Sequence, residues 1–413
     1  MVTMGFLGKS VGKSTRIQYR ILVMLAFFSI SAGLWENFRQ LWLEQNGFSA
    51  TEISNLISFG TLISVVGILL VGRFVKMAKI KYFMLVTLIL RLLNMLGIFG
   101  LYDTASRALI DGCIIVDVLT AYLIITSIYP LLTTVAKSNT VYSRRKLVEY
   151  LFRDVGILIG GLTIGRQFGA LVFDYNGCLL ISALLLVVAF FILYFININP
   201  TERSDRQSQK FSVTKFVLRS KLQRTYMCYS LLSSASFATA VGLKMLILTN
   251  IFDFSASTAT NYLLLVGLLA DGIGILALKF FTPRNDYLTM TLKFGIRLVA
   301  MIIAVLTDNT FICFLAFTWI ILSSTAYENV SDGYYINIVD NRFQLKYNTL
   351  KYVVSITGEA IGIFLCGRMY NFGISHILGL AAAITVVQLI VAYYLIFIRQ
   401  RAGASRPRKH RLG

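Results

Sequence analysis

Carboxylates inside long apolar stretches are the residues of this sequence best suited to chemistry. Glu36, Asp117 and Glu359 each lie in a run of hydrophobic residues. A carboxyl group away from water is harder to ionise, so it can bind and release a proton near neutral pH. Glu359, with Asp117 as the second choice, is therefore the hypothesised proton carrier. The same pattern is also produced by structural ion pairs and by side chains that reach the membrane surface.

Basic residues in the same stretches could pair with these acids or with a bound solute. Glu36 and Arg39 are three residues apart, hence on one helical face, and we predict an ion pair between them. Arg153 and Asp154 are neighbours in a later stretch. The remaining candidates for substrate or proton coupling are Lys244, Asp271 and Glu328.

Motifs of known enzyme chemistry are missing from the sequence. It contains two histidines, and its five cysteines show no C-x-x-C spacing, so a metal site is not expected. H-E-x-x-H and the Walker phosphate loop are also absent, and the G-x-S-x-G spacing occurs once, at Gly8–Gly12 in the polar N-terminal tail, without the strand and helix that position such a nucleophile. We therefore predict no catalytic residues, no metal, no cofactor and no enzymatic activity. An intramembrane lipid-modifying enzyme or a non-transporting receptor remains the alternative from another class.

About 12 apolar blocks must position these residues, each roughly as long as an α-helix that crosses a bilayer. Only 14% of the residues are charged, against about 25% in soluble domains. The blocks are too long and too continuous for the strands of a membrane barrel. The predicted fold class is therefore an all-α integral membrane protein. We place the transmembrane helices at 18–42, 52–72, 82–101, 107–132, 148–171, 177–197, 225–250, 257–280, 288–307, 310–336, 348–370 and 375–398.

Positive charge is concentrated in alternate loops. Counted alternately from the N-terminus, the loops on one side hold nearly all loop cations, among them the N-terminal tail, the segments 73–81, 137–146 and 203–224, and the C-terminal tail. The loops on the opposite side hold little besides Arg107. Basic loops stay on the cytoplasmic side, so both termini are predicted to be cytoplasmic, in the plasma membrane. The net charge of +20 then reflects topology and contact with the lipid bilayer. It does not predict a nucleic-acid partner.

Glycines and one arginine recur at the same spacing in two halves of the chain. The first copy is Tyr150, Gly156, Gly160, Gly165 and Arg166, and the second, 202 residues later, is Tyr352, Gly358, Gly362, Gly367 and Arg368. Further pairs, at offsets of 206 or 207 residues, are Gly60 and Gly267, Gly67 and Gly274, and Arg91 and Arg297. Two parallel six-helix pseudo-repeats are typical of one class of secondary transporter.

The longest polar interruption of the apolar pattern divides the chain near its middle. We predict an N-terminal six-helix bundle over 1–198, a cytoplasmic central loop over 199–224, and a C-terminal six-helix bundle over 225–398. A basic cytoplasmic tail is predicted over 399–413.

With six plus six helices, a polar central loop and cytoplasmic termini, the chain resembles the major facilitator superfamily. The superfamily's Gly-x-x-x-Asp-Arg/Lys-x-Gly-Arg/Lys-Arg/Lys loop is represented here by Gly72 and a basic segment, with Lys76 and Lys79 at the aspartate and second glycine positions. The resemblance implies that helices 2, 5, 8 and 11 join the bundles. Glycines on them are predicted to gate alternating access, with ordinary helix packing as the alternative. They are Gly60, Gly67, Gly156, Gly160, Gly267, Gly274, Gly358 and Gly362.

Charges that occur in only one copy of the repeat are the better candidates for function. Glu359 corresponds to Ile157, and Arg153 corresponds to Ser355. Together with the resemblance, the polar interior predicts a secondary active transporter. It would move a small polar organic solute by alternating access, coupled to protons, and would function as a monomer. A multidrug or metabolite efflux antiporter is the alternative.

Overall fold

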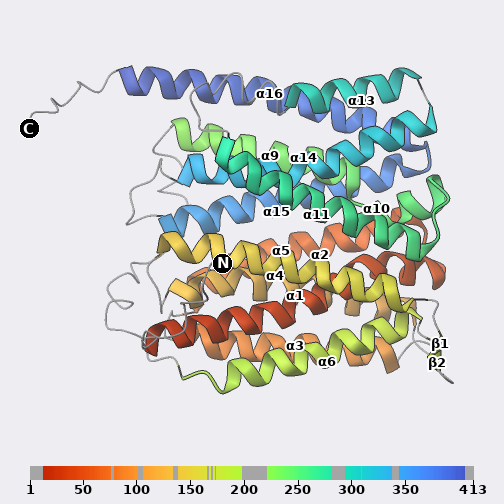
Figure 1. The fold of residues 1–413 in the computed structure, drawn as a ribbon, viewed down its shortest axis with the longest axis vertical. Helices are drawn as coiled ribbons and strands as arrows, with labels where there is room; N and C mark the ends of the chain where they lie inside the picture. The colour runs from red at the N-terminus through yellow and green to blue at the C-terminus, as the bar shows by residue number, and fades with distance from the viewer. Residues whose placement is uncertain are drawn as a thin grey trace, which may run out of the picture. The chain divides into compact units, whose positions relative to one another are not determined.

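Helices form almost all of the structure, a computed structural model (Figure 1). It describes residues 13–75, 79–100, 106–133, 138–164, 167–168, 171–172, 174–197, 221–280, 294–307, 309–336 and 344–404. Gly165, Arg166 and most of the predicted central loop lie outside these residues, as do both chain ends.

Six long helices form the first half of the chain. They are α1 (Lys13–Gln45), α2 (Ala50–Phe74), α3 (Ile80–Gly100), α4 (Arg107–Thr133), α5 (Ser138–Thr163) and α6 (Tyr175–Tyr194). Five of them coincide with a predicted block, whereas α5 only overlaps the predicted 148–171. Its helix begins earlier, in a charged segment, and ends at Thr163 after consecutive glycines, which weaken a helix. The short antiparallel strands β1 (Gln167–Phe168) and β2 (Leu171–Val172) follow it, a small departure from the all-α prediction.

The second half repeats the six-helix pattern with one interrupted helix. Its long helices are α9 (Lys221–Val241), α11 (Ala256–Phe280), α13 (Ile296–Thr307), α14 (Thr310–Ile336), α15 (Gln344–Tyr370) and α16 (Ile374–Ala404). The predicted block 225–250 is broken after Val241, and it continues as α10 (Lys244–Leu246) and the π-helix η2 (Ile247–Ile251). The N-cap of α10, Leu243, has φ −109° and ψ 40°, outside the helical region.

Most of these helices are long and apolar enough to cross a membrane. Among the described residues eight helices meet this condition, and α11, α13 and α14 contain shorter apolar segments at 256–270, 296–307 and 310–323. Helix α5 meets neither condition, since Arg145, Glu149, Arg153 and Asp154 lie within it.

Contacts divide the chain into two compact units. Unit 1 comprises Met1–Glu36 and Leu70–Lys210, and unit 2 comprises Asn37–Leu69 and Phe211–Gly413. The division at 210/211 falls within the predicted central loop, while most of α2 is grouped with the second half of the chain. The domain boundaries derived from the sequence stay a prediction.

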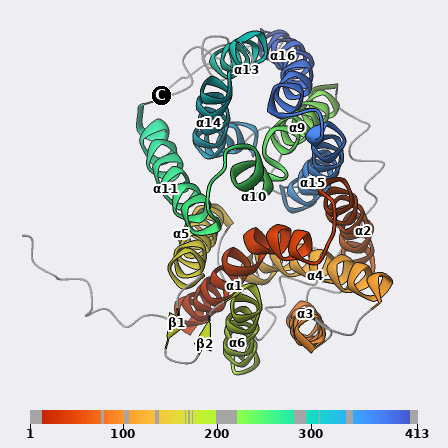
Figure 2. The same cartoon turned by 90° about the vertical axis from the view of Figure 1, so that its right-hand side faces the viewer.

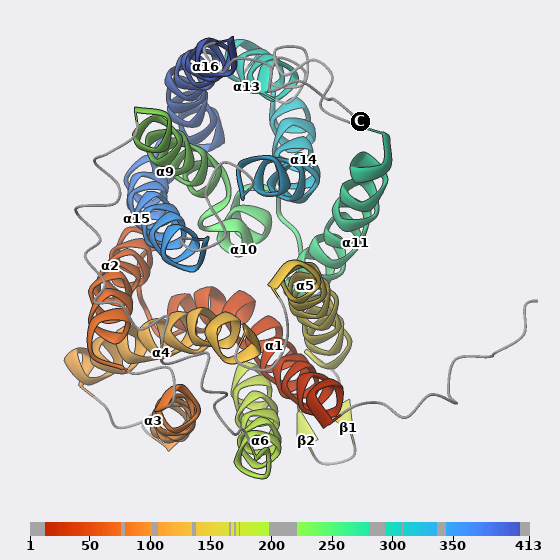
Figure 3. The ribbon, with the colours of Figure 1, turned by 90° about the vertical axis from the view of Figure 1, so that its left-hand side faces the viewer.

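Within unit 1, α3 packs against α4 and α6, and α4 also contacts α5. Helix α1 lies beside α6 (Figure 3). The Ser31 and Ser182 hydroxyls are 2.7 Å apart, and the Ser182 hydroxyl lies 3.8 Å from the Met95 sulfur. These three buried side chains join α1, α6 and α3.

Within unit 2, α9 lies between α15 and α16 (Figure 2), and α13 packs against α14 and α16. The Ser236 and Thr385 hydroxyls are 2.6 Å apart, and the Thr385 hydroxyl lies 4.0 Å from the Met301 sulfur. These residues follow their counterparts in unit 1 by 203 to 206 positions. The parallel repeat predicted from glycine spacing is therefore also present in side-chain contacts.

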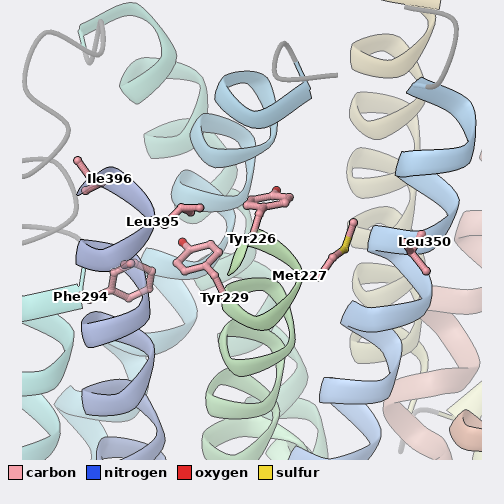
Figure 4. Packing of buried hydrophobic residues seen from close by; sticks show 8 residues of the cluster. Tyr226, Met227, Tyr229, Phe294, Leu350, Leu395 and Ile396 are labelled. Atoms are coloured by element: carbon pink, nitrogen blue, oxygen red, sulfur yellow. The ribbon is translucent and has the colours of Figure 1, made fainter. Parts of the chain in front are cut away.

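A buried cluster that includes three aromatic rings lies at one end of unit 2 (Figure 4). The rings of Tyr226 and Tyr229 on α9 are stacked with centroids 6.0 Å apart. The Phe294 ring meets Tyr229 edge-on at 5.9 Å. Met227 points from α9 toward Leu350 of α15. The remaining buried members, Ala392, Leu395 and Ile396, come from α16, so the cluster fixes α9 against its two neighbours.

Candidate functional site

Glycines bring the backbones of α1 and α5 into contact within unit 1. A Cβ atom added to Gly33 would overlap the Arg153 carbonyl oxygen, and one added to Gly156 would overlap the Ile30 carbonyl oxygen. Small residues are required where helices approach this closely in a membrane. The contact places Arg153 of α5 about one helical turn from Glu36 of α1.

This helix contact brings together two of the predicted site residues. Arg153 Nη2 donates to Glu36 Oε2 at 2.8 Å, and the two side chains are 39% and 17% exposed. We predicted that Glu36 would pair with Arg39, three residues along the same helix, and that prediction is wrong. A guanidinium from a second helix occupies the Glu36 carboxylate instead.

Glycines also pack the corresponding helices of unit 2. Cβ atoms on Gly358 and Gly362 of α15 would overlap the carbonyl oxygens of Leu231 and Ala235 on α9. The polar contact between these two helices is uncharged. It joins the hydroxyls of Ser234 and Ser355, which are 2.5 Å apart.

The two copies therefore differ in charge at one matching position. Ser355 follows Arg153 by 202 residues. The Glu36–Arg153 ion pair thus occupies a helix contact that the second half builds with two hydroxyl groups. A contact needed only for packing does not require the charges.

The gating glycines need a partial correction. We predicted that Gly156, Gly358 and Gly362 contact the opposite bundle, but their Cβ directions face α1 and α9 of their own predicted bundles. Gly367 does make a predicted type of contact, between helices 2 and 11, because Thr51 of α2 donates to its carbonyl oxygen at 3.1 Å. For the other gating positions, Gly60, Gly67, Gly160, Gly267 and Gly274, the role stays a prediction.

Asp117 lies in a separate, fully buried cluster of unit 1. Its Oδ1 is 3.3 Å from Arg91 Nη2, with both side chains 0% exposed, and its Oδ2 accepts from Trp35 Nε1 at 3.1 Å. The Arg91 guanidinium also lies 5.4 Å from the Phe28 ring centroid. This arrangement joins α1, α3 and α4 and favours a structural role for Asp117.

The repeated arginine of unit 2 also lies beside an aromatic ring, with no acidic partner among the described residues. The Arg297 guanidinium lies 5.6 Å from the Phe237 ring centroid, and the position 206 residues after Asp117 is the buried Ser323. The contact between arginine and an aromatic ring therefore occurs in both halves. The position of the Asp117 carboxylate is occupied by a serine in the second half.

The other predicted site residues are distributed over several elements. Arg39 is buried on α1, Asp154 is half-buried beside Arg153, and Lys244 is the first residue of α10. Glu359 is half-buried on α15, next to Gly358. The side chains of Asp271 and Glu328 lie outside the described part of the structure.

A contact that the sequence did not predict holds the broken helix of unit 2. Gln40 Nε2 donates to the Gly242 carbonyl oxygen at 3.0 Å, and Gln40 Oε1 accepts from the Met245 amide at 3.3 Å. The break leaves a backbone carbonyl and a backbone amide that need hydrogen-bond partners. The side-chain amide of Gln40 bonds to both of them. The only feature of the sequence that could have indicated this break is a glycine, Gly242, inside the apolar block.

Further hydrogen bonds surround this contact at the same helix ends. Asn250 of η2 donates to Glu44 of α1, and the Tyr370 hydroxyl of α15 donates to the Leu246 carbonyl oxygen at 3.0 Å. We call this group, centred on Gln40, the α1–α10 clasp.

Replacing Gln40 with leucine is expected to loosen the clasp. The Gly242 carbonyl and the Met245 amide would lose their partner at similar side-chain volume, at a cost of about 1–3 kcal/mol in folding free energy. Hydrogen exchange should become faster at the Met245 amide, and the melting temperature should fall.

Gln18→Leu is the matched control for this change. Gln18 is buried on the same helix and makes no hydrogen bond among the described residues. Unchanged exchange at Met245 in the Gln40 variant would contradict the assignment of the clasp.

No protein-family model and no curated protein match the sequence. Solved structures do match. A mutant form of the nucleoside transporter NupG has a TM-score of 0.68 at 11% identity, covering 92% of this chain and 99% of that chain. A mutant form of the E. coli fucose:proton symporter FucP has a TM-score of 0.61 at 12% identity, covering 93% and 99%. FucP in the outward conformation, named as a major facilitator superfamily transporter, has a TM-score of 0.63 at 12% identity, covering 92% and 98%.

The chain has the major facilitator superfamily fold. This fold confirms the predicted class, with twelve helices in two parallel pseudo-repeats when α9, α10 and η2 are taken as one interrupted helix of the described chain. The apolar helices and this fold together identify an integral membrane protein. The matched structures named here are transporters.

Proposed function

We propose that the chain is a secondary active transporter that moves a small polar organic solute by alternating access, coupled to protons. It acts as a monomer in the plasma membrane, with both termini in the cytoplasm. The fold supports the transporter class. The observation that carries the solute assignment is the Glu36–Arg153 ion pair, which only one of the two repeats contains.

The chemistry of this pair suits recognition of a polar solute. Removing two charges from water is costly, so an ion pair in a membrane helix contact adds little stability compared with hydroxyl groups. The guanidinium is a rigid fork of five N–H donors that matches carboxylate and hydroxyl oxygens. A solute oxygen would bind, beside Glu36, to the Arg153 guanidinium that this carboxylate holds in place at a partly exposed position.

Alternating access requires that one end of the helices open while the other closes. With cytoplasmic termini, the end of α1 that carries the clasp faces the outside. In this proposal Gln40 holds the outer segment α10–η2 closed, and the interruption at Gly242 is where that segment bends.

Flux measurements in proteoliposomes test the proposal. Solutes are first selected by thermal stabilisation of the purified protein, since ligands stabilise the form they bind. A selected solute should then accumulate in vesicles under an inward proton gradient and should equilibrate without one. Absence of flux for every stabilising solute would exclude the transporter assignment. Flux that is independent of the gradient would exclude proton coupling alone.

Replacing Glu359 with glutamine is expected to uncouple transport from protons. The amide keeps the shape of the side chain but cannot bind and release a proton, so gradient-driven accumulation should fall to the equilibrium level. Exchange of labelled against unlabelled solute should persist. Both quantities are measured in the same proteoliposomes.

Glu149→Gln provides the control, because Glu149 undergoes the same chemical change in an ion pair with Arg145 on α5. Proton-driven accumulation at the wild-type level in the Glu359 variant would remove Glu359 from the mechanism.

A further inference from the structure

An open groove of about 590 Å³ lies on unit 1 between the beginning of α1 and the end of α6. Tyr19, Arg20 and Val23 of α1 form one side, and Val188 and Phe191 are among the α6 residues on the other. Because the two helices run in opposite directions, the first turns of α1 meet the last turns of α6. The groove is therefore at one end of the helices, separate from the Glu36–Arg153 pair.

The walls of the groove are almost entirely apolar and face outward. Val23, Val188, Phe191 and Phe195 are exposed, with Phe195 67% accessible. The Phe191 ring stacks on that of Phe195, at a centroid distance of 6.4 Å and an interplanar angle of 19°. Such an apolar wall suits a hydrocarbon chain lying along the helices.

Among the described residues that line the groove, Arg20 alone is charged. It is exposed, and it forms no hydrogen bond or ion pair with any described residue. The neighbouring cation Lys81 is already engaged, since its Nζ donates to the carbonyl oxygens of Tyr194 at 3.0 Å and Ile196 at 2.7 Å. The guanidinium of Arg20 is thus available to an anion, and its planar fork matches a phosphate.

Along α1 a cationic group is followed by apolar groups, which matches the order of phosphate and acyl chain in a phospholipid. The apolar span begins at Thr15, so Arg20 lies just inside it, where a long basic side chain extends its charge to the headgroup level. Val23 follows one turn deeper. The cytoplasmic leaflet, where positive charge places this end, carries the anionic lipids.

We propose that this groove is a binding site for an anionic phospholipid, with the phosphodiester on Arg20 and an acyl chain along Val23, Val188 and Phe191. The commitment to an anionic lipid rests on the exposed Arg20 guanidinium above an apolar wall. One basic contact of this kind corresponds to a preference of about five-fold over a zwitterionic lipid.

Lipid titration of the purified full-length protein tests the proposal. Dioleoyl phosphatidylglycerol and dioleoyl phosphatidylcholine are added separately to the protein in detergent, and bound lipid is counted by native mass spectrometry. Wild-type protein should bind phosphatidylglycerol about five-fold more tightly. Arg20→Gln should abolish that preference. Val188→Trp, which fills the groove, should weaken binding of both lipids.

Arg224→Gln is the matched control, because Arg224 is exposed near the start of α9, 204 residues after Arg20. It should keep the preference for phosphatidylglycerol. Melting temperatures without added lipid confirm that each variant is folded. The proposal is overturned if Arg20→Gln retains the preference, if Arg224→Gln loses it equally, or if the wild type binds both lipids with equal affinity.

Discussion

Replacing Glu36 with glutamine is expected to reduce solute transport by roughly 30-fold or more, in both accumulation and exchange. The substitution leaves the Arg153 guanidinium without its carboxylate, and loss of one partner from a hydrogen-bonded charge pair costs about 2–5 kcal/mol. Because the pair is partly exposed to solvent, the lower end of that range applies, equivalent to the stated factor. Initial rates of labelled solute exchange in proteoliposomes measure the effect.

The matched control is Ser355→Ala, which removes the corresponding polar contact of unit 2. It should leave transport within about two-fold of wild type, since a hydroxyl pair contributes about 1 kcal/mol or less to stability. Glu36→Asp, which keeps the charge, should restore part of the lost rate. Wild-type exchange in Glu36→Gln would show that the ion pair does not act on the solute.

Replacing Asp117 with asparagine is expected to be the most destabilising single change in unit 1. Arg91 would remain fully buried with no carboxylate to balance its charge. Breaking a buried pair in this way costs about 3–5 kcal/mol of unfolding free energy. Thermal unfolding of the purified variant, monitored as the loss of monodisperse protein with temperature, measures the effect.

A double variant separates the cost of the unpaired charge from a general loss of packing. Arg91→Met combined with Asp117→Leu removes both charges at similar volume, and it should recover most of the stability. If the double variant is less stable than Asp117→Asn, the cluster stabilises the fold by something other than charge balance. If Asp117→Asn melts with the wild type, the buried pair makes no contribution.

The helices and the repeat could be predicted from the sequence because both depend on local composition. Long apolar blocks define where helices cross a bilayer, and regularly spaced glycines are visible without coordinates. The Glu36–Arg153 pair could not be predicted this way, since 117 residues separate its members. Spacing rules relate Glu36 only to residues such as Arg39 on the same helix. Its true partner is set by where Gly33 and Gly156 allow two backbones to meet.

The interruption of the seventh predicted helix was missed for a related reason. The block 225–250 is uncharged apart from Lys244 and rich in apolar residues, so composition predicts an unbroken helix. The break is tolerated because Gln40, a residue of α1, binds the backbone on both sides of it. A stabilising partner two hundred residues away leaves no mark in the local sequence.

The hydroxyl contact between Ser31 and Ser182 bears on how the chain is made. It joins the first helix to the sixth, so it can form as soon as α6 leaves the ribosome. At about 5–20 residues per second, the second half takes roughly 10–40 s longer to synthesise. Ser236 and Thr385 then join α9 to α16, the last helix of the chain. Each half thus has its own hydrogen bond between its first and last helices, and the two halves can assemble one after the other during translation.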